Sequence, residues 1–289
     1  MHTPRIALLL MTYNGMAYLD ELLRSLYAQT YTHWTLYIQD DFSTDGTYDY
    51  LRTLPAKDSR ICVMDRTEKM GPMKGFLTLL RTVKADYYMF CDQDDVWMPE
   101  KIEVTLGCMR RAEETYGPTC PVAVHTDLTV TDSHLSVTAP SFWHISRIEP
   151  ELLRTFNEQA GHNLCTGCTM MLNGAAREVS ADYTDRVLMH DAWVTLRVLH
   201  AGGHIAEVRR PTILYRQHGS NSVGARDVSR RYVTSRLARL GAVWRENRAR
   251  YAMFRDAGYG SVVLYLYHKW RYFLRYKHTL KTNPQHAQR

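Results

Sequence analysis

The sequence has no long apolar run and no dense cysteine framework, and both absences narrow what the protein can be. Its six cysteines include a single CxxC pair, Cys165 and Cys168, with no second pair to complete a structural zinc site. We therefore expect free thiols in a reducing compartment. The first apolar run, residues 6–11, is too short for the core of a signal peptide or for a bilayer span, which predicts a cytoplasmic protein.

Acidic residues are scarce in the last part of the chain. Residues 226–289 contain 15 of the 36 Lys and Arg residues but only 3 of the 30 Asp and Glu residues, whereas residues 1–225 are mildly acidic. The chain has no internal repeat and no low-complexity linker. We expect one large domain over residues 1–225 and a basic, aromatic-rich helical region over residues 226–289 that meets an anionic partner.

The first hundred residues alternate strand and helix signals, the pattern of a parallel α/β sheet with crossover helices. Apolar runs predict strands over residues 6–11, 34–39, 61–64 and 87–91, with a helix from residue 19 and another over 76–83 after a glycine-bearing loop, 71–75. Later patterns predict strands over 122–125, 128–130, 169–172, 204–208 and 212–216, and helices over 191–201, 228–254 and 262–280. Residues 138–163 lack a period and are rich in Trp, His and Pro, which we interpret as a functional loop region.

Polar clusters follow three of the predicted strands. They are Thr12-Tyr13-Asn14, Asp40-Asp41 and Asp92-Gln93-Asp94-Asp95. One aspartate after a strand is usually a turn former or a helix cap. Ligands of parallel α/β sheets, however, bind at the carboxyl ends of the strands, so three clusters at one edge favour a binding site.

Residues 92–95 carry three carboxylates, which repel one another unless a cation lies among them. Carboxylate oxygens are the ligands that Mg²⁺ or Mn²⁺ prefers, and such ions commonly bridge to phosphates. We interpret the cluster as a site for a divalent ion on a diphosphate. The alternative is a solvated acidic turn.

These clusters carry a resemblance to a known family. The segments at residues 10–15, 39–47 and 90–97 are similar, in order and spacing, to motifs of the family 2 glycosyltransferases, which have the GT-A fold. The form Asp-Gln-Asp-Asp-Val-Trp, with Tyr215-Arg216-Gln217-His218 downstream, resembles the bacterial rhamnosyltransferase branch. The resemblance covers about residues 5–225, and the helical extension after it is not covered.

The resemblance implies a role for each matching residue. The nucleotide-sugar donor would contact Thr12, Tyr13 and Asn14, which line the nucleotide pocket. Asp41 would bind the pyrimidine base, Asp92 would bind the ribose, and Gly167 would lie near the donor sugar. The metal, Mg²⁺ or Mn²⁺, would be held by Asp92, Asp94 and His218, and His218 would complete the metal shell or contact the diphosphate instead. Asp191 would be the general base, and His190 replaces the glutamate that precedes this aspartate in the family. Lys74, in the predicted loop, is a candidate contact for phosphate or base, or a solvated lysine.

We therefore expect a metal-dependent, inverting glycosyltransferase that moves a sugar to a hydroxyl of a polysaccharide or lipid-linked glycan. The sugar that we expect first is rhamnose. An inverting transfer needs one base and positive charge at the leaving diphosphate. The donor is dTDP-rhamnose or, as the alternative, a UDP-sugar such as UDP-galactose or UDP-glucose. Two other classes stay open: a metal-dependent phosphohydrolase or nucleotidyltransferase, and a nucleic-acid binding module.

Residues 265–277 interleave aromatic and cationic side chains. Aromatic rings favour the membrane–water interface, and Lys and Arg favour anionic headgroups. We expect this segment to place the protein peripherally on the inner face of the cell membrane. The alternatives are a helix that packs its aromatics against the domain, or a nucleic-acid binding element, which we do not expect.

Overall fold

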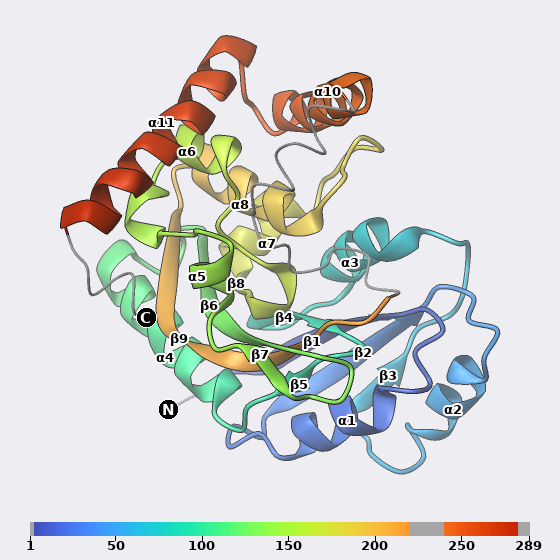
Figure 1. The fold of residues 1–289 in the computed structure, drawn as a ribbon. Helices are drawn as coiled ribbons and strands as arrows, with labels where there is room; N and C mark the ends of the chain where they lie inside the picture. The colour runs from blue at the N-terminus through green and yellow to red at the C-terminus, as the bar shows by residue number, and fades with distance from the viewer. Residues whose placement is uncertain (1–2, 220–239, 283–289) are drawn as a thin grey trace.

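The computed structural model of the chain describes residues 3–219 and 240–282. One mixed, nine-stranded sheet lies at the centre, with helices on both of its faces (Figure 1). The N-terminal half contains β1 (Ile6–Thr12), α1 (Leu19–Tyr27), β2 (Trp34–Asp40), α2 (Thr47–Thr53), β3 (Ile61–Val63), α3 (Gly71–Thr82), β4 (Tyr87–Asp92), β5 (Val96–Trp97), α4 (Lys101–Tyr116) and β6 (Val122–Thr131). It is followed by β7 (Val137–Ala139), α5 (Phe142–Ile145), η1 (Pro150–Leu152), α6 (Phe156–Gly161), η2 (Gly167–Thr169), β8 (Met171–Asn173), α7 (Gly174–Ser180), α8 (His190–His200), β9 (His204–Arg216), α10 (Leu240–Asp256) and α11 (Val262–Thr282).

The strand order is β3-β2-β1-β4-β8-β6-β9-β5, with β7 paired to β6. The first four strands are parallel, as the alternating pattern predicts. The strand β8 runs antiparallel to both of its neighbours, β4 and β6, so it joins the parallel half to the rest of the sheet. The carboxyl ends of β1, β2 and β4 consequently lie side by side at one edge.

The strand β1 shows why its sequence is apolar throughout. Its side chains alternate between two cores: Ala7 and Leu9 pack with α3 and α8, while Leu8 and Leu10 pack with α1 and α4. A strand covered on both faces needs apolar residues at every position. The continuous run over residues 6–11 is the consequence.

Two predicted pairs of strands are single strands in the structure. Residues 122–131 form β6, and residues 204–216 form β9, which pairs with β6 in parallel with an irregular register around Asp127 and Pro211. The prediction split them because polar residues interrupt the apolar runs at these points, and because proline has no N–H for the ladder. The predicted strand over 169–172 is also shifted, since residues 167–169 form the 3-10 turn η2 and β8 begins at Met171.

The prediction of a loop over residues 138–163 is wrong in part, because α5, η1 and α6 lie within it. These helices have only one or two turns, too few for a period to show in the sequence. The helix α6 begins with a capping box, in which Thr155 and Glu158 satisfy each other's backbone N–H groups. It packs against α11, so the segment forms part of the protein core.

The C-terminal helices α10 and α11 lie on the α8 and α6 side of the molecule (Figure 1). The predicted helix over residues 228–254 appears as α10 from Leu240 onward, and its earlier residues lie outside the described part of the chain. Within the described residues, no helix combines the length and the apolar character needed to cross a bilayer.

Candidate active site

The three polar clusters meet at one edge of the sheet, as expected. In the register of the parallel strands, Thr12 of β1 pairs with Asp40 of β2, and Met11 pairs with Asp92 of β4. The ends of β1, β2 and β4 are therefore level with one another. The loops that follow these strands build the candidate site.

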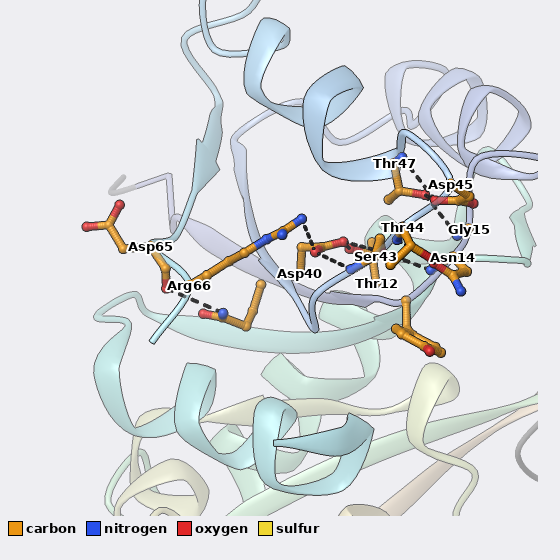
Figure 2. Close-up of polar contacts among 12 residues, drawn as sticks. Thr12, Asn14, Gly15, Asp40, Ser43, Thr44, Asp45, Thr47, Asp65 and Arg66 are labelled. Atoms are coloured by element: carbon orange, nitrogen blue, oxygen red, sulfur yellow. Dashed lines mark hydrogen bonds and ion pairs between the residues drawn. The ribbon is translucent and has the colours of Figure 1, made fainter. Parts of the chain in front are cut away.

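Asp40 holds the first two of these loops together. Its buried carboxylate accepts hydrogen bonds from Thr12 Oγ1 at 3.0 Å and from the Ser43 N–H at 2.9 Å, and it pairs with Arg66 Nη2 at 2.6 Å (Figure 2). The Thr12 side chain thus lies within this network. Through its bond to Asp40, it ties the end of β1 to the end of β2.

Asn14 locks the same loop in a conformation that few side chains adopt, with φ at +48°. Its N–H donates to Ser43 Oγ at 2.8 Å, and its Oδ1 accepts from the Thr44 N–H at 2.8 Å. The next residue, Gly15, donates its N–H to Thr47 Oγ1 at 3.0 Å. Figure 2 shows these bonds joining the β1–α1 loop to the β2–α2 loop.

Asp41 is buried and caps α3 from a distance. Its two oxygens accept the N–H groups of Met70 and Gly71, at 2.7 and 3.1 Å. The predicted loop over residues 71–75 is therefore wrong, because these residues form the first turn of α3. The cap comes from 30 residues upstream, so no local residue announces where the helix starts.

Tyr13 is an exposed residue of the first cluster. Its backbone is held by the Gln93 side chain, whose Oε1 accepts the Tyr13 N–H at 2.9 Å and whose Nε2 donates to the Tyr13 carbonyl at 3.0 Å. The ring is 46% exposed, and Lys69 Nζ lies 4.2 Å from its centre. An exposed ring beside a cation suits the stacking of a nucleobase and the binding of phosphate.

Lys74, a candidate from the sequence, lies in the first turn of α3. Its Nζ makes an ion pair with Asp185 Oδ1 at 2.6 Å, and both side chains are exposed. Such surface pairs add little to stability. The structure therefore places Lys74 in a surface contact between α3 and the loop before α8.

The acidic cluster concentrates negative charge in a small volume. Burial and the neighbouring carboxylates of Asp94 and Asp191 raise the pKa of Asp92 to about 7. Asp95 is fully buried, and its Oδ2 has no N–H or O–H partner within hydrogen-bonding distance among the described residues. Ligand atoms of Asp92, Asp95 and Cys168 lie within 4.8 Å of one another.

A hard divalent cation fits this donor set. The carboxylates supply oxygen ligands and excess negative charge, and the buried Asp95 Oδ2 has no N–H or O–H donor among the described residues. Cys168 does not fit as a ligand, because burial and the nearby aspartates raise the pKa of its thiol well above the ordinary value, so that it keeps its proton. Behind the cluster lies Lys101, fully buried, with Nζ 4.6 Å from the Trp97 ring and a pKa lowered by burial to about 8.

His218 joins the acidic cluster from the end of β9, as the sequence predicts. Its Nε2 lies 2.8 Å from Asp94 Oδ2, and its ring stacks on Tyr18 with 4.7 Å between centroids. Arg216, two residues earlier, is buried and holds the loop itself. Its Nε donates to the Asp94 carbonyl at 2.9 Å, its backbone N–H to Asp95 Oδ1 at 3.3 Å, and its Nη1 to the Ser133 carbonyl at 2.7 Å.

Asp191 lies in the first turn of α8, close enough to Asp92 for the two charges to interact. The carboxylate is buried, with Oδ1 2.6 Å from the Ala192 N–H and a further hydrogen bond from the Gly167 N–H. Burial raises its pKa to about 6, with these hydrogen bonds acting in the opposite direction. A carboxylate with this pKa is mostly ionised at pH 7 yet basic enough to take a proton.

Gly167 faces the imidazole of His190. A Cβ at this glycine would lie 2.2 Å from His190 Nε2, so the histidine occupies the space that a side chain would need. His190 packs between Phe76 and Phe90, with centroids 4.5 and 4.8 Å away, and burial lowers its pKa to about 3. The residue that replaces the family's glutamate is therefore a neutral, aromatic packing group.

The sequence does not predict a positioning role for three residues of the site: Tyr18, Gln93 and Arg216. Gln93 and Arg216 lie inside the motifs that carry the resemblance, so their place in a motif was the available signal. Tyr18 follows a loop and precedes α1, and no local pattern indicates that it stacks on a histidine 200 residues away.

Comparisons with known proteins agree with this geometry. The family model described as "Glycosyl transferase family 2" matches residues 8–180. The dTDP-rhamnosyl transferase RfbG of Shigella flexneri is 26% identical over 234 residues, which are 74% of this chain and 73% of RfbG. The UDP-Glc:alpha-D-GlcNAc-diphosphoundecaprenol beta-1,3-glucosyltransferase WfgD of Escherichia coli is 28% identical over 104 residues, 36% of this chain.

Several curated relatives are matched over less than half of their length, as with WfgD, of which 40% is covered. Among solved structures, the mannosyltransferase PcManGT of Pyrobaculum calidifontis, in complex with GDP-Man and Mn²⁺, gives a TM-score of 0.56 at 18% identity, covering 78% of this chain and 59% of PcManGT. A likeness at this level of identity shows a shared fold.

Proposed function

The chain belongs to glycosyl transferase family 2 and has the GT-A fold, and on this basis we propose that it moves one sugar, with inversion, from a nucleoside diphosphate donor to an acceptor hydroxyl. One observation carries the proposal. The carboxylate of Asp191 is buried beside the acidic cluster, within electrostatic reach of Asp92, and has a pKa of about 6. A base and a diphosphate-binding cluster at the same edge of the sheet are what a single displacement requires.

The donor would lie along the loops after β1, β2 and β4. Tyr13, with Lys69 above its ring, would stack on the base. Asp41 would accept a hydrogen bond from the pyrimidine, since a carboxylate that caps two N–H groups still has lone pairs to offer. Asn14 and Thr12 would hold the loop against which the nucleotide lies, and Asp92 would bind the ribose.

Asp92, Asp94 and His218 would hold the divalent ion, Mg²⁺ or Mn²⁺. When bound, it would supply positive charge at the diphosphate. His218 reaches Asp94 only because Arg216 ties the loop of the acidic cluster to the end of β9. The protein thereby presents its metal ligands before any donor binds.

Asp191 would act on the acceptor. Its carboxylate takes the proton of the attacking hydroxyl while the acceptor oxygen bonds to the anomeric carbon and the bond from that carbon to the diphosphate oxygen breaks. The nucleoside diphosphate leaves with the bonding electron pair. Gly167 would approach the donor sugar through its backbone, because its N–H is held by Asp191 and its side-chain space is filled by His190.

We propose dTDP-rhamnose as the donor, supported by the match to RfbG over most of both chains. A UDP-sugar is the alternative, supported by the shorter match to WfgD. The acceptor in this proposal is a polysaccharide or a lipid-linked glycan. The name of WfgD gives alpha-D-GlcNAc-diphosphoundecaprenol for that protein, which supports the lipid-linked choice. The six free thiols suit a reducing compartment, and a lipid-linked acceptor would bring the enzyme to the inner face of the membrane.

Calorimetric titration with dTDP and with UDP, each with and without Mn²⁺, tests the proposal. We expect one nucleotide to bind in a metal-dependent manner. Asp94→Asn should weaken that binding at least ten-fold in the presence of Mn²⁺, while Glu114→Gln, an exposed acid on α4, should not. If neither nucleotide binds, or if Asp94→Asn leaves metal-dependent affinity unchanged, the proposed donor site is wrong.

A further inference from the structure

The helix α11 has two different apolar faces, and one of them is packed. Tyr265 and Tyr272 are buried, and Tyr272 stacks on His162 with 4.4 Å between centroids. The Tyr272 hydroxyl donates to the Arg147 carbonyl at 2.6 Å and accepts the Glu149 N–H at 2.9 Å. This tyrosine face fixes α11 on α6 and η1, so the alternative of a helix that packs its aromatics against the domain holds for this side.

The other face is exposed. Five large apolar residues on it have 47% to 71% of their surface exposed, and we call them the outer stripe: Val263, Leu266, Tyr267, Trp270 and Leu274. Counted from Val263, they stand at positions 0, 3, 4, 7 and 11, the spacing of one helix face. Because each residue turns the helix by about 100°, Trp270 and Tyr272 point in nearly opposite directions.

Charge in this part of the chain has one sign. Residues 257–289 contain no Asp or Glu, against six Lys and Arg residues. In Figure 1, α11 lies at the outer edge of the molecule, on the far side of α6 from the sheet. Of these cations, Arg275 pairs with Glu158 at 2.6 Å, and Lys269 Nζ lies 3.3 Å from the Tyr265 hydroxyl. A continuous apolar face at the edge of a molecule, on a segment with a net positive charge, marks an interaction surface.

We propose that the outer stripe of α11 binds the surface of an anionic phospholipid bilayer, with the helix lying parallel to it. Tyr and Trp suit the depth of the headgroups, Val and Leu suit the acyl boundary, and the surrounding cations match anionic lipids. The proposal depends on the proposed function for its purpose, which is to bring the active site to a lipid-linked acceptor.

Two other occupants fit less well. A second copy of the chain would bring two cationic segments without acidic residues face to face, and like charges across an interface repel. A nucleic acid would need cations and stacking rings along the contact, whereas three of the five outer-stripe residues are aliphatic.

Vesicle flotation of the full chain tests the proposal, with phosphatidylcholine vesicles and with vesicles containing about one third phosphatidylglycerol. Leu266→Ser/Trp270→Ser removes the centre of the outer stripe. Leu264→Ser/Val137→Ser is the matched control, because it removes two exposed apolar side chains outside the stripe. All four positions are exposed, so both variants should fold, which circular dichroism checks.

We expect the wild type and the control to float with the anionic vesicles, and the stripe variant to bind them at least ten-fold more weakly. The free energy gained by burying two large apolar side chains exceeds the roughly 1.4 kcal/mol that corresponds to a ten-fold change in affinity. Equal binding by the stripe variant overturns the proposal. The absence of vesicle binding by the wild type also overturns it. In that case, a wild-type dimer that the stripe variant breaks would identify a second copy as the occupant, and RNA binding would identify a nucleic acid. Nucleotide binding, measured by calorimetry on the same variants, should be unchanged, so a failure of the donor site is recognised separately.

Discussion

Replacing Asp191 with asparagine separates two consequences of one buried carboxylate. As the proposed base, Asp191 would act in its ionised form, and general bases of this kind contribute about 10²–10⁴-fold to a rate. Asp191→Asn should therefore lower transfer by that factor and leave nucleotide affinity unchanged, because the side chain acts on the acceptor. In the wild type, transfer should rise with pH through about 6, where this carboxylate loses its proton.

The same substitution should stabilise the fold at neutral and alkaline pH. Burial raises the pKa of Asp191 from 3.8 to about 6, so the folded state holds the proton more tightly than the unfolded state does. The stability of the wild type consequently falls as pH rises from about 4 to about 6, by about 3 kcal/mol at about 1.4 kcal/mol for each pKa unit. The amide has no charge and escapes this loss, although it forfeits one hydrogen bond, to the Ala192 or the Gly167 N–H, at about 1 kcal/mol.

A net gain of about 2 kcal/mol corresponds to a Tm increase of about 4–8 °C for a domain of this size. Circular dichroism melts at pH 8 and pH 4.5 measure it, and the gain should vanish at the lower pH. Asp182→Asn, an exposed aspartate, is the control and should shift Tm at neither pH. A variant that melts no higher than the wild type at pH 8 refutes the burial argument, and transfer retained to within a few-fold refutes the role as base.

Two further substitutions test how the site is held. Arg216→Lys keeps the charge but loses the planar group that reaches the Asp94 and Ser133 carbonyls. The Mn²⁺ affinity measured by calorimetry should therefore fall about 10–100-fold, while nucleotide binding without metal stays the same. An unchanged Mn²⁺ affinity would show that Arg216 does not position the proposed metal ligands. Gly167→Ala places a Cβ against His190 and should destabilise the fold by about 1–3 kcal/mol in urea unfolding, and adding His190→Ala should recover part of that loss; additive effects would contradict the contact.

The sequence predicts most accurately where one local cause decides the structure. The strands β1 and β4 are buried on both faces, so their apolar runs are visible in the sequence. The bounds of β1 to β4 agree with the prediction to within a residue or two. The strands β6 and β9 were cut in two, because Asp127 and Pro211 interrupt the pattern although long pairing continues around them. Tertiary pairing overrides a local break of this kind.

The candidate site shows the same difference between features that local sequence determines and features that tertiary contacts determine. The polar clusters after β1, β2 and β4 could be placed together because parallel strands end at the same edge. What each side chain does there could not be read locally. Asp41 caps a helix that starts 30 residues later, and Gly167 has its side-chain space filled by His190 from another helix.

The two proposed metal ligands, Asp94 and His218, come together through such a long-range contact. His218 is 124 residues from Asp94, and its approach to that carboxylate depends on where β9 ends in the sheet. That end is fixed by Arg216, which pairs with Thr131 in the ladder and binds both Asp94 and Asp95 through its own backbone and side chain. A shift of β9 by one residue would turn Arg216 to the other face of the sheet and withdraw His218. The irregular register around Pro211 is therefore as much a part of the candidate site as the aspartates are, because it determines which residues of β9 face the acidic cluster.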